Sequence, residues 1–175
     1  MIYNPWKIIY KSEMPVYIEP ANKIFSGEYL SAINDLNNLL LDTDPTDLKT
    51  LSMIHINLME AFFKIRDTNP KNTEQFMFHA KEALKYGHNT GLAPYRLIVG
   101  FEKQNRISKA IEVCKIVTTN EYNFSIYGYK QKPEFIERLK KLELKNRKIQ
   151  DSCLEPFCTD YERNMIIKNS NIKQE

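Results

Sequence analysis

The sequence predicts an all-α protein made of antiparallel helical hairpins that stack on one another and end in a C-terminal capping helix. Apolar residues recur at helical spacing along most of the 175 residues, and only five residues are glycine. No alternation of apolar and polar residues is long enough to indicate a strand. With 42% hydrophobic and 27% charged residues, the chain has the composition of one globular domain that buries a core.

The expected helices are separated by short breakers. Tyr29–Leu41 carries its Leu, Ile and Ala residues on one face and ends before Pro45, which cannot continue a helix. Leu48–Arg66 follows, with Thr46 or Asp47 as its N-cap. The same spacing predicts helices over Thr73–Tyr86, Pro94–Lys103, Ile107–Thr118 and Pro133–Lys148. Helices of this length pack as antiparallel hairpins, which need neighbours to bury their apolar faces.

Two segments of the chain resemble each other. GEYLSAINDLNNLLLDTDP (27–45) and NRISKAIEVCKIVTTNEY (105–122) place a turn residue before Ala-Ile, with apolar residues four and seven positions after the alanine. This pattern resembles the second helix of a tetratricopeptide repeat. Alignment on the small position brings Ala32, Phe76 and Ala110 into register at spacings of 44 and 34 residues. We assign the longer interval to insertions near Asp47–Leu51 and in the Thr68–Asn72 turn.

The first helix of each hairpin supports this register in two of three cases. Leu58 and Phe62, and likewise Leu97 and Phe101, occupy positions where the family has a packing leucine and an aromatic residue. In the first hairpin Pro20 and Lys23 stand where the family has a small residue and an aromatic one. We therefore expect that helix to be short or distorted.

The turn residues, and the positions that depart from the family pattern, complete the comparison with the repeat family. Gly87 suits the left-handed position after a helix, and Asn105 replaces the glycine that the family prefers, because asparagine also visits this region. Phe76 is a further departure, since the family has a small residue there. The resemblance covers about residues 13–122 and implies about three repeats in a short solenoid.

The resemblance also implies a binding site, since the first helices of such repeats line a concave groove that takes up a peptide or a partner helix. Carried over by position, the groove residues are Tyr17, Ala21, Ile24, Met53, Ile56, Asn57, Glu60, Phe63, Lys64, Tyr95, Val99, Glu102 and Lys103. The set is mostly apolar and lacks the Lys/Asn/Arg pattern with which chaperone-docking members hold a C-terminal carboxylate.

Three interpretations of this apolar face stay open. It receives a hydrophobic peptide or amphipathic helix, or several of its residues are simply core. Alternatively, the chain's own tail, or that of a second copy, fills it through Leu154, Phe157, Tyr161, Ile166 and Ile167.

The net charge of +3 conceals a local basic excess. Residues 130–148 hold eight Lys or Arg and three Glu. The candidate basic patch consists of Lys140, Lys141, Lys145, Arg147 and Lys148. These residues suit a solvated capping helix, which we favour, or contacts with nucleic-acid phosphates.

The sequence offers no catalytic or metal-binding pattern, so we expect no enzymatic activity, metal or cofactor. His55, His79 and His88 have no partner at a metal-ligand spacing, and we expect them on helix surfaces or in a loop. Cys114 falls on a buried helix face, whereas Cys153 and Cys158 have no second pair to complete a zinc site.

We expect a cytoplasmic protein, because the three cysteines do not form a disulfide framework and neither a signal peptide nor a membrane span is evident. The expected organisation is an N-terminal arm (1–12), repeats (13–122), a linker with the basic capping helix (123–149) and a tail (150–175). The expected function is a non-enzymatic module that binds a protein or peptide in the groove. The alternative is a nucleic-acid-associated regulator that uses the basic helix.

Overall fold

The computed structural model describes residues 14–119, 121–125, 130–146 and 159–171. These ranges contain eight helices and no strand, which confirms the all-α prediction. The helices are α1 (Ile18–Phe25), α2 (Tyr29–Asp42), α3 (Leu48–Lys64), α4 (Pro70–Lys85), α5 (Leu92–Lys103), α6 (Ile107–Thr118), α7 (Lys132–Asn146) and α8 (Asp160–Ser170).

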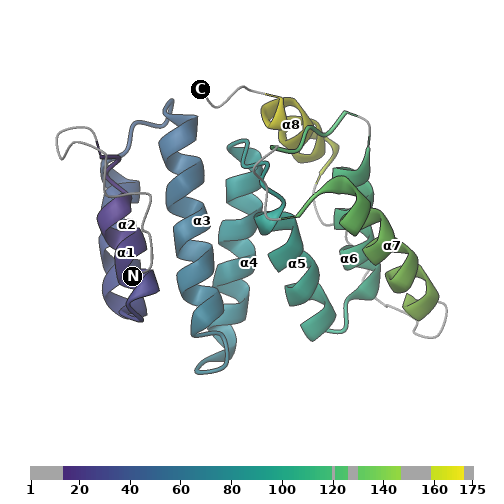
Figure 1. Cartoon of the computed structure of the whole chain (residues 1–175), viewed down its shortest axis with the longest axis horizontal. Helices are drawn as coiled ribbons and strands as arrows, with labels where there is room; N and C mark the ends of the chain where they lie inside the picture. The colour runs from purple at the N-terminus through teal and green to yellow at the C-terminus, as the bar shows by residue number, and fades with distance from the viewer. Residues whose placement is uncertain (1–13, 120, 126–129, 147–158, 172–175) are drawn as a thin grey trace, which may run out of the picture.

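The helices α1 to α7 form one array in chain order, from α1 and α2 at one end to α7 at the other (Figure 1). Each helix from α2 to α6 packs against its successor, and α1 packs against both α2 and α3. The last helix, α8, lies across one edge of the array and packs against α4 and α6.

Several helix ends form as the sequence predicts. Asp47 is the N-cap of α3, and its carboxylate accepts a hydrogen bond from the backbone N–H of Thr50 at 3.0 Å. Gly87 and Asn105 have positive φ angles of 89° and 57°, the left-handed conformation expected after α4 and α5. The first helix, α1, has only eight residues, as the proline and lysine in its sequence indicated.

The second hairpin differs from the expected insertions. Pro70–Asn72, which we assigned to a lengthened turn, forms the first turn of α4. Asn69 caps this helix by accepting a hydrogen bond from the N–H of Lys71 at 3.0 Å, and Pro70 occupies the first position, where a missing N–H costs nothing. The extra residues therefore lengthen helices, since α3 and α4 have 17 and 16 residues whereas α5 and α6 have 12 each.

The core consists of two buried clusters that meet at α3. The smaller includes Ile24 and Leu36 and joins α1, α2 and α3. The larger extends from α3 to α8 and includes Phe135 of α7 and Ile166 of α8. The larger cluster also contains Tyr122, so it includes residues from each of the expected segments 13–122, 123–149 and 150–175.

Residues 87–91, which we call the joint, connect α4 to α5 and touch segments distant in the sequence. Gly87 has φ 89°, and a Cβ there would lie 2.7 Å from the backbone oxygen of Asn169 in α8. Gly91 has φ 77°, and a Cβ there would overlap the carbonyl group of Lys130, just before α7. Both positions require glycine for the backbone angle and also for the close approach.

We predict that Gly91→Ala lowers the free energy of unfolding by about 3 kcal/mol or more, because left-handed strain adds to a steric overlap. Gly27→Ala is the matched control, since Gly27 has φ 87° but a Cβ added there would meet no other atom within 4 Å. It should cost only about 1–2 kcal/mol. Urea unfolding followed by circular dichroism measures both; equal losses would contradict the close packing at the joint.

Candidate functional site

Ion pairs connect α3, α5 and α7 along one side of the array. The guanidinium of Arg96 in α5 binds both carboxylate oxygens of Glu60 in α3, at 2.6 and 3.0 Å. Lys103, at the end of α5, lies 2.5 Å from Asp67. Arg138 of α7 pairs with Glu102 of α5. We call the surface that these residues share the α3–α5–α7 face.

Phe63 lies within this face beneath two guanidinium groups. The carbon centres of Arg96 and Arg66 lie 3.7 and 4.2 Å from the centroid of its ring, a geometry that allows cation–π attraction. The ring also contacts Phe76 edge to face, with centroids 5.4 Å apart. Phe63 is therefore a covered, half-buried residue and not the open groove residue that the sequence suggested.

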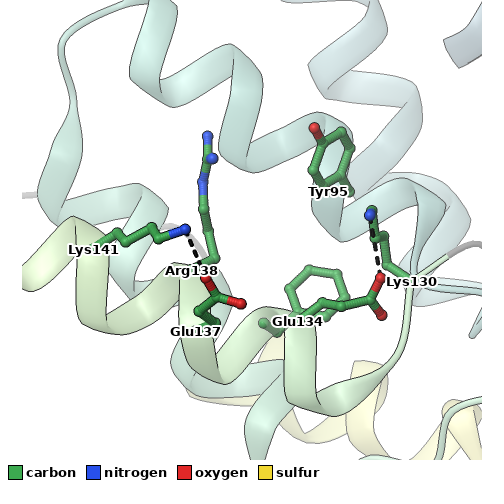
Figure 2. A pocket seen from close by; sticks show the side chains of 7 residues that line it. Tyr95, Lys130, Glu134, Glu137, Arg138 and Lys141 are labelled. Carbon is green, nitrogen blue, oxygen red and sulfur yellow. Dashed lines mark hydrogen bonds and ion pairs between the residues drawn. The ribbon is translucent and has the colours of Figure 1, made fainter.

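A pocket of about 220 Å³ opens between α5 and α7 at one end of this face (Figure 2). It is lined by Tyr95, Lys130, Glu134, Phe135, Glu137, Arg138 and Lys141. In Figure 2, Tyr95 stands on the opposite side of the opening from Glu134 and Glu137. Phe135 is buried, and its aromatic side chain is part of the lining.

The lysines and glutamates of the pocket neutralise one another. Lys130 lies 3.2 Å from Glu134, and Lys141 lies 2.7 Å from Glu137. A hydrogen bond from the backbone N–H of Gln131 lowers the pKa of Glu134, and the ammonium group of Lys141 lowers the pKa of Glu137. Both glutamates are therefore ionised at neutral pH, and the pocket combines two aromatic rings with paired charges.

The predicted groove residues fall into three groups. Ile24 and Ile56 are core residues, so placing them in an accessible groove was wrong. Lys64 and Lys103 are exposed, and the remainder are half-buried: Tyr17, Ala21, Met53, Asn57, Glu60, Phe63, Tyr95, Val99 and Glu102. Polar contacts satisfy several of them, including Asn57, whose amide donates to the carbonyl oxygen of Met53 at 2.8 Å. The face is consequently more polar than expected.

The described part of the tail, α8, packs against α4 and α6, whereas the predicted groove lies on α1, α3 and α5. Ile166 is buried, but Tyr161 is exposed. Leu154 and Phe157 lie outside the described residues. The described tail therefore occupies a different surface from the one proposed for it.

Polar contacts fix α8 on this surface. The carboxylate of Glu162 lies 3.2 Å from the ammonium groups of both Lys81 and Lys85 in α4. A hydrogen bond from the backbone N–H of Thr159 lowers the pKa of Glu162 to about 2, and the two lysines act in the same direction. Thr159 and Glu162 form a capping box, a spacing that is visible in the sequence and was the signal for this missed helix.

The three histidines are buried. The expectation of helix-surface positions is wrong for His55 and His79, whereas His88 lies in a loop. His55 of α3 and His79 of α4 place their Nδ1 atoms 2.9 Å apart, so one ring donates a hydrogen bond and the other accepts it. His88, in the joint, has its Nε2 atom 2.6 Å from the hydroxyl of Thr90. Burial lowers the pKa of His55 to about 4, of His79 to about 3 and of His88 to about 4.

We predict that acidification destabilises the protein before its carboxylates titrate. Unfolded histidines have a pKa near 6.5, so between about pH 6.5 and 4 the unfolded chain binds more protons than the folded one. The free energy of unfolding should fall by about 2 kcal/mol per histidine between pH 7 and pH 5. Urea unfolding across this range measures the loss, and His88→Gln should remove about one third of it. A flat profile would contradict the burial of neutral rings.

The described residues contain no group of three or more His, Cys, Asp or Glu side chains placed to hold a metal ion. Cys114 is buried as expected, and burial raises the pKa of its thiol to about 12.

Of the candidate basic patch, Lys140, Lys141 and Lys145 are exposed on α7. Arg147, Lys148, Cys153 and Cys158 lie outside the described residues.

No family model, curated protein sequence or solved structure matches this chain. Within the described ranges, every helix is too short or too polar to cross a membrane.

Proposed function

We propose that this chain is a non-enzymatic interaction module that binds a peptide segment of a partner protein on the α3–α5–α7 face. The size of the pocket between α5 and α7 carries the proposal. Sites for small molecules usually enclose about 300–1,000 Å³, whereas this pocket encloses about 220 Å³. That volume suits one large side chain of a peptide.

The lining of the pocket indicates the guest. Tyr95 and Phe135 supply aromatic surface, while the lysines and glutamates at the rim balance one another. An aromatic or large aliphatic side chain gains apolar contact there without leaving a buried charge unpaired. The ion pairs along the face then provide donors and acceptors for the polar groups of the peptide.

We further propose that the array is a tetratricopeptide-like solenoid of about three repeats. The three residues aligned in the sequence, Ala32, Phe76 and Ala110, have no exposed surface, which is expected where the second helix packs on the first. Asn105 adopts the left-handed turn that the family gives to glycine. A reducing cytoplasm suits such a module, since the described cysteine is a buried thiol.

Contact with nucleic acid through α7 is the second candidate, and the exposed lysines Lys140 and Lys145 favour it. Three glutamates on the same helix, Glu134, Glu137 and Glu143, reduce the attraction for phosphate. Peptide binding therefore has the stronger support.

We predict that peptides selected from a random display library on the full-length protein lose affinity by about 10-fold or more for Tyr95→Ala, because that ring forms a wall of the pocket. Fluorescence anisotropy with labelled peptides measures the dissociation constants.

Phe78→Ala is the matched control, since Phe78 is an exposed aromatic residue on α4, away from the pocket lining. It should leave the affinity unchanged. Failure to enrich any peptide, or selected peptides that respond to Phe78→Ala and not to Tyr95→Ala, would refute the proposed site. Binding that collapses between about 50 and 200 mM salt would instead indicate phosphate-like contacts.

A further inference from the structure

The two ends of the array carry opposite charge. Residues 14–47, which contain α1 and α2, hold six carboxylates and one lysine, a balance of −5. Residues 130–146, which contain α7, hold six Lys or Arg and three Glu, a balance of +3. These segments lie at opposite ends of the long axis of the molecule (Figure 1).

Both ends also expose apolar side chains on their outer helices. On α2, Leu30 and Leu41 are 74% and 84% exposed, and their spacing of eleven residues puts them on one side of the helix. On α7, Ile136 and Leu144 are 39% and 59% exposed, with Lys140 one turn from each. Since α2 packs on α1 and α3, and α7 packs on α6, these side chains point away from the array.

Acidic residues lie at both ends of α2. Glu28 and Asp42 are exposed at the two ends of α2, two residues before Leu30 and one residue after Leu41. Each end therefore combines exposed apolar side chains with a net charge of one sign, and the net charge of the other end is opposite.

We propose that copies of this chain associate head to tail, with the outer face of α2 in one copy against the outer face of α7 in the next. A two-fold dimer would place like charges together at either end, so the complementary arrangement is heterologous and extends into a chain or closes as a ring. Both sites involve α7, but this association uses Ile136, Lys140, Leu144 and Lys145, which do not line the peptide pocket.

A second copy of the chain accounts for the charge at both ends of the array, whereas nucleic acid accounts for the charge at only one end. Phosphates would engage the lysines of α7 but would repel the acidic end and leave its exposed leucines uncovered. Burial of apolar side chains adds a contribution to the free energy of association that salt does not screen. The charged side chains around them act over about 8 Å at physiological ionic strength.

Sedimentation velocity of the full-length protein tests the proposal. We expect the weight-average mass to rise above 20.7 kDa with increasing concentration at low salt. We expect association to weaken by about 10-fold when salt is raised from about 50 to 500 mM.

Charge reversal at each end identifies the contact. Lys140→Glu with Lys145→Glu, or Glu28→Lys with Asp42→Lys, should each weaken association by at least about 10-fold. A chain with all four substitutions should associate again, because its ends are complementary with the signs exchanged. Lys71→Glu with Lys115→Glu is the matched control, as it makes the same change in net charge as the lysine reversal on exposed residues of α4 and α6.

A monomer at every concentration in low salt would overturn the proposal. So would association that neither reversal weakens, or a four-substitution chain that stays monomeric while circular dichroism shows it folded. Anisotropy of a labelled oligonucleotide tests the competing interpretation. If the protein does not self-associate but binds the oligonucleotide, and if the lysine reversal abolishes that binding, α7 is a nucleic-acid site.

Discussion

The close approach at the joint, residues 87–91, is the constraint on which the arrangement of the C-terminal half depends. Gly91 lets the carbonyl group of Lys130 lie against its backbone, and Gly87 does the same for Asn169 of α8. The hydroxyl of Tyr122 donates to the carbonyl oxygen of His88 at 3.2 Å. One five-residue turn therefore holds the segment before α7 and the end of α8 against α4 and α5.

The candidate site follows from this constraint. The backbone N–H of Tyr95 donates to the carbonyl oxygen of Gly91 at 3.2 Å, and that of Lys130 donates to Thr90 at 3.3 Å. Tyr95 and Lys130 both line the pocket, so its two sides are set by the same turn. The pairing of Arg138 with Glu102 then fixes the other end of the cleft between α5 and α7.

The sequence predicted the helices better than their lateral contacts. Periodicity and helix-ending residues placed α5 and α6 within two residues, whereas α8 was missed because most of its side chains are polar. Ile56 was misplaced because helical spacing defines a face but not the boundary between core and surface. The pairing of His55 with His79 depends on how α3 and α4 align, which no local pattern encodes. The pocket likewise required the position of α7 relative to α5.

Native-state hydrogen exchange of the joint tests this account most directly. The N–H groups of Ser125 and Lys130 lie outside regular helices and donate to Asn89 and Thr90, at 3.0 and 3.3 Å. If the joint holds α7 in place, these two amides exchange as slowly as helical amides of α5, because all are released in the same opening. Exchange at the rate of an unprotected loop, with α5 still protected, would contradict it.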